Sequence, residues 1–288
     1  MTAGFVTASA TPCSAHPQPV SQESLTGGDV GGVLKQTNAE AARLAEKKAL
    51  VAEYLRVRDG FADPADLAAL ESKFEDDAAP TTVKGNAKEA GPLAVLPPES
   101  PSYPASKTLP LTQYGQSKSY YCGPASAYMI LKYSSAGSSN YDGASLSQST
   151  LANSTYLQTE QRGATTWASG RFSVALNRWL FGSDSGYYLN ETAPAAADFM
   201  SYVQYDIGSN GRPLAGDTVE FAGGLHYNGH PRTQTIGHWI VAYGYISSGV
   251  TTYWADPATT VWATVSPKFS YGTTSFANNF LQSNGVTW

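Results

Sequence analysis

The stretch GHWIVAYGYISSGVTTYWADP, residues 237–257, has the pattern of two short strands joined by a tight turn. The apolar runs 239–246 and 250–255 flank a Ser-Ser-Gly turn signal and predict a β-hairpin. His238 and Asp256 then lie together at the open end of this hairpin. An imidazole beside a carboxylate on a rigid sheet is held in one tautomer, and its imidazolium form is stabilised. Taken alone, Asp256 before a proline also fits an ordinary turn at the end of a strand.

A single cysteine, Cys122, is the candidate nucleophile upstream of this hairpin. It stands at the start of a helix predicted over residues 121–133, in which Pro124 is tolerated in the first turn. A helix N-terminus and a nearby imidazole lower the pKa of a thiol and favour the nucleophilic thiolate. Gly123 leaves room for a substrate to approach. The alternative is a buried structural cysteine, which is the commoner fate of an isolated thiol.

Covalent acyl transfer also needs hydrogen-bond donors for a tetrahedral oxyanion. The backbone N–H of Cys122 is one candidate donor, and the side-chain amide of Gln116, six residues upstream, is the other. Gln113 competes with Gln116 for this role, and a glutamine in a polar loop is usually only solvated.

Residues next to the cysteine and the histidine are candidates for lining a substrate groove. They are Tyr121, Gly123, Gly237 and Trp239. Aromatic side chains next to a helix and a strand are more often part of the core, so both interpretations stay open for Tyr121 and Trp239.

The pair His226 and His230 has the i, i+4 spacing of a zinc-binding helix. Gly229 and Pro231 break any helix here, and the glutamate of the zinc motif is missing. We therefore predict a loop that flanks the substrate cleft, with no metal and no cofactor.

The runs QSKSYYCGPAS (116–126), GHWIVAYGY (237–245) and WADP (254–257) together resemble the cysteine peptidases typified by the bacteriocin leader-processing domain. The resemblance covers roughly residues 111–288. It implies a papain-like α+β fold, in which a helix that carries the cysteine packs against an antiparallel sheet that carries the histidine and the aspartate.

The resemblance also implies the roles of four residues. These are Cys122 as nucleophile, His238 as general base and acid, Asp256 as orienting carboxylate and Gln116 as oxyanion donor. Leader-processing peptidases are commonly fused to a transporter with membrane helices and a nucleotide-binding motif, and this sequence shows neither. It looks more like the stand-alone exported relatives, so we predict a secreted or extracytoplasmic protein, although the first residues contain no clear signal peptide.

The composition excludes several classes of protein. Charged residues make up only 14 % of the chain and the net charge is -5, which argues against nucleic acid as a partner. The apolar runs are too short to cross a bilayer, so a soluble protein is expected. The two cysteines, Cys13 and Cys122, are too few for a disulfide scaffold or a multi-cysteine zinc site.

Charge marks the domain boundary, because residues 1–110 carry 24 charged residues and residues 111–288 only 17. Thr37 and Glu40 form a predicted capping box at the start of a helix that ends near Gly60. A second helix is predicted from Asp63-Pro64 onward. The expected organisation is a disordered leader, a helical hairpin, a Pro/Ala/Gly-rich linker and a peptidase domain, over residues 1–36, 37–77, 78–110 and 111–288. The hairpin is expected to dock on the peptidase domain as a pro-segment or docking arm, and the alternative is an anchoring spacer that never touches the cleft.

Within the peptidase domain the pattern predicts two further helices, over Trp167–Trp179 and Ala195–Tyr205, and another strand over Val261–Phe269. The function predicted from these observations is a cysteine peptidase or amidase that acts on peptide or protein substrates through a thioester. Two alternatives stay open: an enzyme of transpeptidase or transglutaminase type that passes the acyl group to an amine, and a catalytically silent module that binds peptide or cell-wall material.

Overall fold

The computed structural model of the chain describes residues 29–78 and 104–288. In chain order the elements are α1 (Asn38–Arg58), α2 (Pro64–Ala78), β1 (Lys107–Thr108), α3 (Cys122–Tyr133), α4 (Gln148–Leu151), α5 (Thr159–Arg162), the 3-10 helix η1 (Trp167–Ser169), α6 (Arg171–Phe181), β2 (Asn190–Thr192), α7 (Ala196–Tyr202), the π-helix η2 (Val203–Ser209), β3 (Leu214–Glu220), β4 (Ile236–Ile246), β5 (Thr251–Ala255), the 3-10 helix η3 (Pro257–Thr260), β6 (Lys268–Gly272), α8 (Thr273–Phe280) and β7 (Gly285–Thr287). Cys13, most of the predicted leader and most of the predicted linker lie outside the described residues.

The two N-terminal helices begin where the sequence predicts. The hydroxyl of Thr37 accepts the backbone N–H of Glu40 at 3.2 Å, and the Glu40 carboxylate accepts the backbone N–H of Thr37 at 2.7 Å. This capping box satisfies two N–H groups that the first turn of a helix leaves without partners. The second helix begins at Pro64, whose fixed φ suits the first turn.

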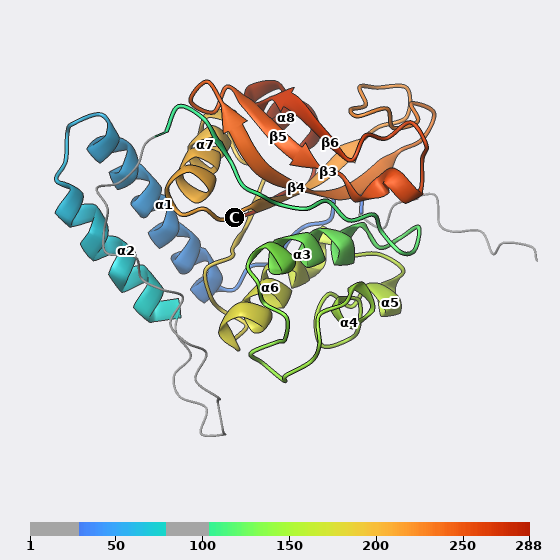
Figure 1. Ribbon diagram of the computed structural model, residues 1–288, viewed down its shortest axis with the longest axis horizontal. Coiled ribbons are helices and arrows are strands. Elements are labelled where there is room, and N and C mark those ends of the chain that lie inside the picture. The colour runs from blue at the N-terminus through green and yellow to red at the C-terminus, as the bar shows by residue number, and fades with distance from the viewer. Residues whose placement is uncertain (1–28, 79–103) are drawn as a thin grey trace, which may run out of the picture.

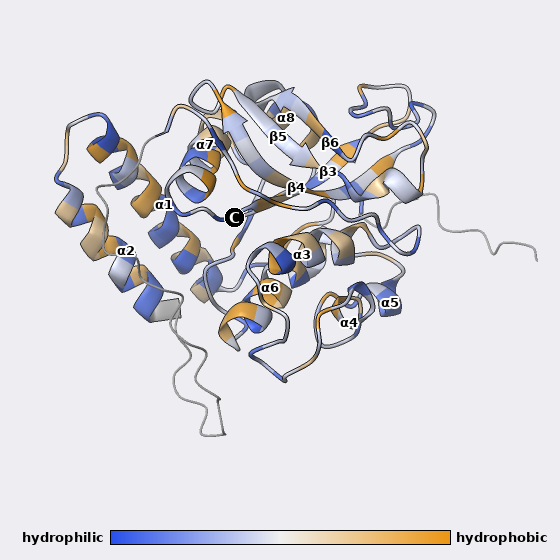
Figure 2. Ribbon diagram, in the orientation of Figure 1, coloured by the Kyte–Doolittle hydropathy of each residue, from blue (hydrophilic) through white to orange (hydrophobic). Residues whose placement is uncertain are grey.

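Helices α1 and α2 lie side by side against the rest of the protein, next to α7 (Figure 1). Apolar and hydrophilic residues alternate along both helices, so each offers one face to a partner (Figure 2). On the docked face of α1, the ring of Tyr54 packs edge-on against Tyr205 of η2, with 5.3 Å between the ring centroids.

A buried ion pair fixes this docking. The side chain of Lys47 is fully buried, and its Nζ lies 3.4 Å from Oδ2 of Asp206 and 3.2 Å from the carbonyl oxygen of Tyr187. Burial lowers the pKa of Lys47 to about 7, although the charge of Asp206 acts in the opposite direction. Tyr187 Oη donates to the other oxygen of Asp206 at 2.7 Å, so this carboxyl group is held from both sides.

The sheet is antiparallel throughout the described residues, with strand order β2-β7-β3-β4-β5-β6 and with β1 also paired to β4. The predicted hairpin is confirmed as β4 and β5, in which Val241 pairs with Ala255. This register puts His238 and Asp256 at the same end of the two strands.

Helices cover both faces of this sheet (Figure 1). On one face Trp239 of β4 stacks on Phe172 of α6, with 4.0 Å between ring centroids. On the other face Trp254 of β5 stacks on Phe276 of α8 at 4.5 Å. Helix α3 packs against β4, where the hydroxyl of Ser126 donates to the carbonyl oxygen of Trp239 at 2.9 Å. The arrangement is the α+β class that the sequence predicts.

Three predicted elements differ from the structure. The strand predicted over Val261–Phe269 is wrong, because Asp256 caps η3 and the next strand, β6, begins only at Lys268. The helix predicted over Trp167–Trp179 is divided at Gly170, which takes a φ of +63° between η1 and α6. The sheet also begins inside the predicted linker, since β1 pairs with β4.

The sequence did not predict the central strand β3, which lies between β7 and β4. Its sequence LAGDTVE contains a glycine and two acids, yet every residue in it is buried. Among the described helices, none is both long enough and apolar enough to cross a membrane.

Replacing Lys47 by alanine should lower the free energy of unfolding by about 3–5 kcal/mol at pH 6, where Lys47 is protonated. The reason is that Asp206 loses its buried counter-charge. Urea denaturation measures this difference. The matched control is Lys73→Ala on α2, whose side chain is exposed, with an expected change within about 0.5 kcal/mol. Equal losses in both variants would contradict a docking role for Lys47.

Candidate active site

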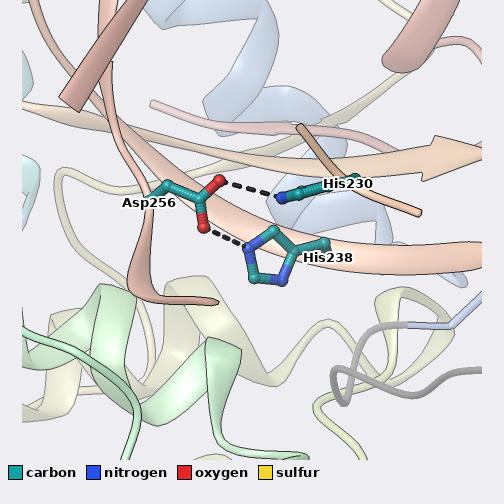
Figure 3. A group of neighbouring side chains, drawn as sticks. All are labelled: His230, His238 and Asp256. Carbon is teal, nitrogen blue, oxygen red and sulfur yellow. Dashed lines mark hydrogen bonds and ion pairs between the residues drawn. The ribbon is translucent and has the colours of Figure 1, made fainter. Parts of the chain in front are cut away.

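His238 and Asp256 form a buried pair at the open end of the β4–β5 hairpin. Nε2 of His238 lies 2.8 Å from Oδ1 of Asp256, and both side chains are fully buried (Figure 3). An ionised carboxylate only accepts hydrogen bonds, so Nε2 carries the proton of the neutral imidazole. Nδ1 points away from the carboxylate and has no hydrogen-bond partner among the described residues. It is therefore the ring atom that can take up a proton.

The local sequence explains why Asp256 stays in place. Asp256 is the N-cap of η3, and its Oδ1 also accepts the backbone N–H of Ala258 at 2.8 Å. Pro257 follows as the first helical residue, so the Asp-Pro pair begins this short helix. Burial would raise the pKa of Asp256, but the charge that His238 carries when protonated, together with hydrogen bonds from His230 and His238, holds it well below its usual range.

Cys122 is the first residue of α3, and its thiol is free and fully buried. The sulfur accepts the backbone N–H of Trp239, which belongs to the peptide that joins His238 to Trp239. The fold therefore brings the thiol next to His238, although 115 residues separate them in the chain. Sγ and Nδ1 of His238 are not hydrogen-bonded to each other in this arrangement.

The pKa of Cys122 departs from the sequence-based expectation. Burial raises it well above its usual value, and the nearby Asp217 raises it further, while the N–H of Trp239 acts in the opposite direction. The sequence predicts a lowered pKa, because it shows the helix N-terminus but not the exclusion of water. The resting group is thus a neutral thiol.

The two candidate glutamines lie in the loop before α3. Nε2 of Gln116 donates to the carbonyl oxygens of Lys118 and Ser119 at 3.0 and 2.7 Å, and its buried Oε1 finds no hydrogen-bond partner within residues 29–78 and 104–288. Nε2 of Gln113 donates to the carbonyl oxygen of Asp256 at 2.7 Å. Gln113 therefore fixes the backbone at Asp256, and both N–H groups of the Gln116 amide are already engaged.

The four predicted lining residues, Tyr121, Gly123, Gly237 and Trp239, are all buried. Tyr121 bonds through its hydroxyl to Glu160, and Nε1 of Trp239 donates to the carbonyl oxygen of Thr165 at 2.8 Å. Both aromatic side chains therefore belong to the core of this closed arrangement. A role in substrate binding stays a prediction for all four.

His230 is the site residue that the sequence did not assign. It lies in the loop 221–235 between β3 and β4, as predicted for a non-helical segment, but its side chain turns inward. Nε2 of His230 lies 3.0 Å from Oδ2 of Asp256, and Nδ1 lies 2.5 Å from Oε2 of Glu220. The spacing of His226 and His230 pointed to this loop, but only the inward turn of the loop brings His230 to the carboxylate.

His230, His238 and Asp256 supply ligand atoms within 4.8 Å of one another, a set of types that metal ions use. Both Nε2 atoms, however, point at carboxylate oxygens rather than at a common empty point (Figure 3). The contacts describe a hydrogen-bonded cluster, and we assign no metal to it.

Asp217 is a second unforeseen residue, on β3 beside the thiol. Burial raises its pKa well above the usual value, and the charge of Asp29 raises it further. Asp29 comes from the segment before α1, and its Oδ1 accepts the backbone N–H of Trp167 at 2.6 Å. The N-terminal segment thus reaches the neighbourhood of Cys122.

These features define the class of site: a thiol at a helix N-terminus beside an imidazole–carboxylate pair on an antiparallel sheet. Residues 108–287 match the model of the Peptidase_C39 like family. Because the match covers more than half of the chain, the protein belongs to this family and is a relative of the cysteine peptidases. No curated protein and no solved structure matches the sequence.

Replacing Gly123 by alanine should destabilise the protein by about 1–3 kcal/mol, although alanine is the better helix former. A Cβ at this position would lie 2.1 Å from Oγ1 and 2.4 Å from Cβ of Thr165. The additional change Thr165→Gly should recover part of the loss. The control is Gly137→Ala, where a Cβ meets nothing within 4 Å. Thermal unfolding compares the variants, and equal effects at Gly123 and Gly137 would contradict the close approach.

Proposed function

We propose that the protein is a cysteine peptidase or amidase of papain-like fold, with Cys122 as nucleophile, His238 as base and acid, and Asp256 as orienting carboxylate. One observation carries this proposal. Asp256 holds Nε2 of His238, which leaves Nδ1 without a partner beside the peptide that contacts the Cys122 sulfur. Membership of a peptidase family supports it independently.

The first half of the reaction follows from these positions. The thiol of Cys122 gives its proton to Nδ1 of His238, and the thiolate sulfur attacks the substrate carbonyl carbon. Asp256 stabilises the imidazolium that forms. The backbone N–H of Cys122 is among the N–H groups that the first turn of a helix leaves unpaired, so it is a donor for the oxyanion.

The second half returns the proton. Nδ1–H of His238 protonates the leaving amine as the C–N bond breaks, which leaves a thioester on Cys122. His238 then removes a proton from water, and the hydroxide oxygen attacks the thioester carbonyl carbon. The C–S bond breaks, the acid leaves, and His238 returns the proton to the Cys122 sulfur. Gln116 joins as an oxyanion donor only when its amide gives up a hydrogen bond to Lys118 or Ser119.

Full burial of Cys122, His238 and Asp256 requires that the site opens before a peptide can enter. The segment before α1 is the candidate cover, since Asp29 lies against Asp217 near the thiol. Residues 37–77 then act as a docked pro-segment rather than a free spacer, held by Lys47 and Asp206. An exported enzyme kept closed until it meets its peptide substrate fits this organisation.

Cys122→Ala should lower cleavage of a proteome-derived peptide library by about 10³-fold or more, because the attacking atom is removed. Mass spectrometry of the digests measures the loss and shows which bonds are cut. Cys13→Ser is the matched control and should retain full cleavage. Cleavage that persists in the Cys122 variant, or disappears in the Cys13 variant, would assign the reaction to a different group. Adding an amine acceptor separates hydrolysis from acyl transfer by the products.

Asp29→Ala should speed alkylation of Cys122 by iodoacetamide about tenfold, because the covering segment loses its hydrogen bond to Trp167. Mass spectrometry of the peptide that contains Cys122 gives the rate. The control is Asp66→Ala, an exposed acid on α2, for which no change is expected. An unchanged rate for Asp29→Ala would mean that another segment covers the thiol.

A further inference from the structure

A buried chain of four side chains continues from His238 beyond Asp256. His230 bonds through Nε2 to Oδ2 of Asp256 at 3.0 Å and through Nδ1 to Oε2 of Glu220 at 2.5 Å. His238 bonds to the other oxygen of the same carboxylate at 2.8 Å (Figure 3). The side chains of all four residues are fully shielded from solvent.

The contacts define the charge of His230. Both ring nitrogens face carboxylate oxygens, and an imidazole can donate to two acceptors only when both nitrogens carry a proton. Burial alone would lower the pKa of His230, but the hydrogen bonds and charges of Asp256 and Glu220 raise it to about 9. His230 is therefore a cation at neutral pH.

Glu220 is itself held rigidly, since its Oε1 accepts the backbone N–H of Tyr227 at 2.7 Å. The other titratable group against His230 is Tyr227, whose ring centroid lies 4.6 Å away. Burial raises the pKa of Tyr227 well above its usual value, so it stays a neutral phenol. The charged groups that face His230 are thus Glu220, Asp256 and, when protonated, His238, whose ring centroid is 5.3 Å distant.

The positive charge of His230 beside Oδ2 changes how strongly Asp256 stabilises the imidazolium form of His238. A buried carboxylate with no other counter-charge would stabilise the imidazolium of His238 strongly, and the ring would release its proton slowly. The reaction proposed above needs His238 to accept a proton and then give it away. The positive charge of His230 offsets part of the carboxylate charge, and its ring also repels a second imidazolium.

We propose that His230, held between Glu220 and Asp256, is a positioning residue that fixes the Asp256 carboxylate and offsets part of its charge, so that His238 can both accept and release its proton. This inference rests on the proposed function of Cys122, His238 and Asp256. It assigns His230 a task in the active site without contact with the substrate.

The test replaces the cation by a neutral amide. In His230→Gln the amide can still donate to Asp256, but the charge is gone, so the imidazolium of His238 should persist to higher pH. The double variant His230→Gln with Glu220→Gln also removes the buried Glu220 charge, which protects the fold. The titration midpoint of His238 should rise in the double variant too, but by less. The lost charge of Glu220 acts against the lost charge of His230, and Glu220 is farther from His238.

The readout is the titration of the His238 ring, followed by NMR on the full chain labelled with carbon-13 histidine. The chain contains only four histidines, so the four signals can be told apart. We expect the midpoint of His238 to rise by about 1–2 pH units in His230→Gln. The acid limb of kcat/KM, where His238 must lose its proton before it can act as the base, should move upward by the same amount, while kcat falls. The matched control is His226→Gln in the same loop, because His226 bonds to the carbonyl oxygen of Gln234 and not to Asp256. In this variant, neither the titration midpoint of His238 nor the pH profile of kcat/KM should move.

A second control separates charge from hydrogen bonding. Nδ2 of Asn228 also donates to Oδ2 of Asp256 at 2.8 Å, and Asn228 has a φ of +49° that glycine tolerates. Asn228→Gly should lower activity through loss of a hydrogen bond without moving the His238 midpoint. Equal shifts in Asn228→Gly and His230→Gln would overturn the role of charge.

An unchanged His238 midpoint in both His230 variants would overturn the proposal outright. This outcome is distinguishable from failure of the proposed function, because the NMR titration needs no turnover. If Cys122→Ala retains activity while the His238 midpoint still shifts in His230→Gln, the coupling between the two imidazoles stands and the enzymatic role fails. If activity depends on Cys122 and the midpoint does not move, only the role of His230 fails.

Discussion

A carboxylate without water is stable only where hydrogen-bond donors surround it, and Asp256 is the group on which this structure depends. Its four donors come from three segments: the ring of His238 on β4, the backbone N–H of Ala258 in η3, and the side chains of Asn228 and His230 in the loop before β4. Removing any segment would leave a buried charge partly unsatisfied. The same contacts that hold the fold together at this end of the sheet therefore orient the proposed base.

The dry interior that strengthens these hydrogen bonds also keeps the thiol neutral. Burial raises the pKa of Cys122, and the acid of Asp217 adds to this effect. In the proposed function, such a closed site opens only when the covering segment moves and a substrate takes its place. The N-terminal helices contribute to this state, because Lys47 inserts a cation into the protein and Asp29 reaches the surroundings of the thiol. Stability and proposed regulation thus share the same buried polar contacts.

Local sequence determined much of the fold and half of the candidate site. The capping box at Thr37, the helix that begins at Cys122 and the β4–β5 hairpin are all short-range features, because turn residues and hydrophobic periodicity act within a few residues. The hairpin also decided that His238 meets Asp256, since register alone brings the two ends together. The prediction of a strand over Val261–Phe269 was wrong, because Asp256 caps the short helix η3 and the strand β6 begins only at Lys268.

Only the tertiary structure decided what surrounds these groups. The strand β3 is buried on all sides although its sequence shows no alternation, because its neighbours supply the apolar contacts that its own residues lack. Nothing near His230 in the chain indicates Glu220 and Asp256 as partners, since these contacts arise when a loop folds over the sheet end. The charge of a buried group depends on the solvent and the acids around it, and those come from residues far away in sequence.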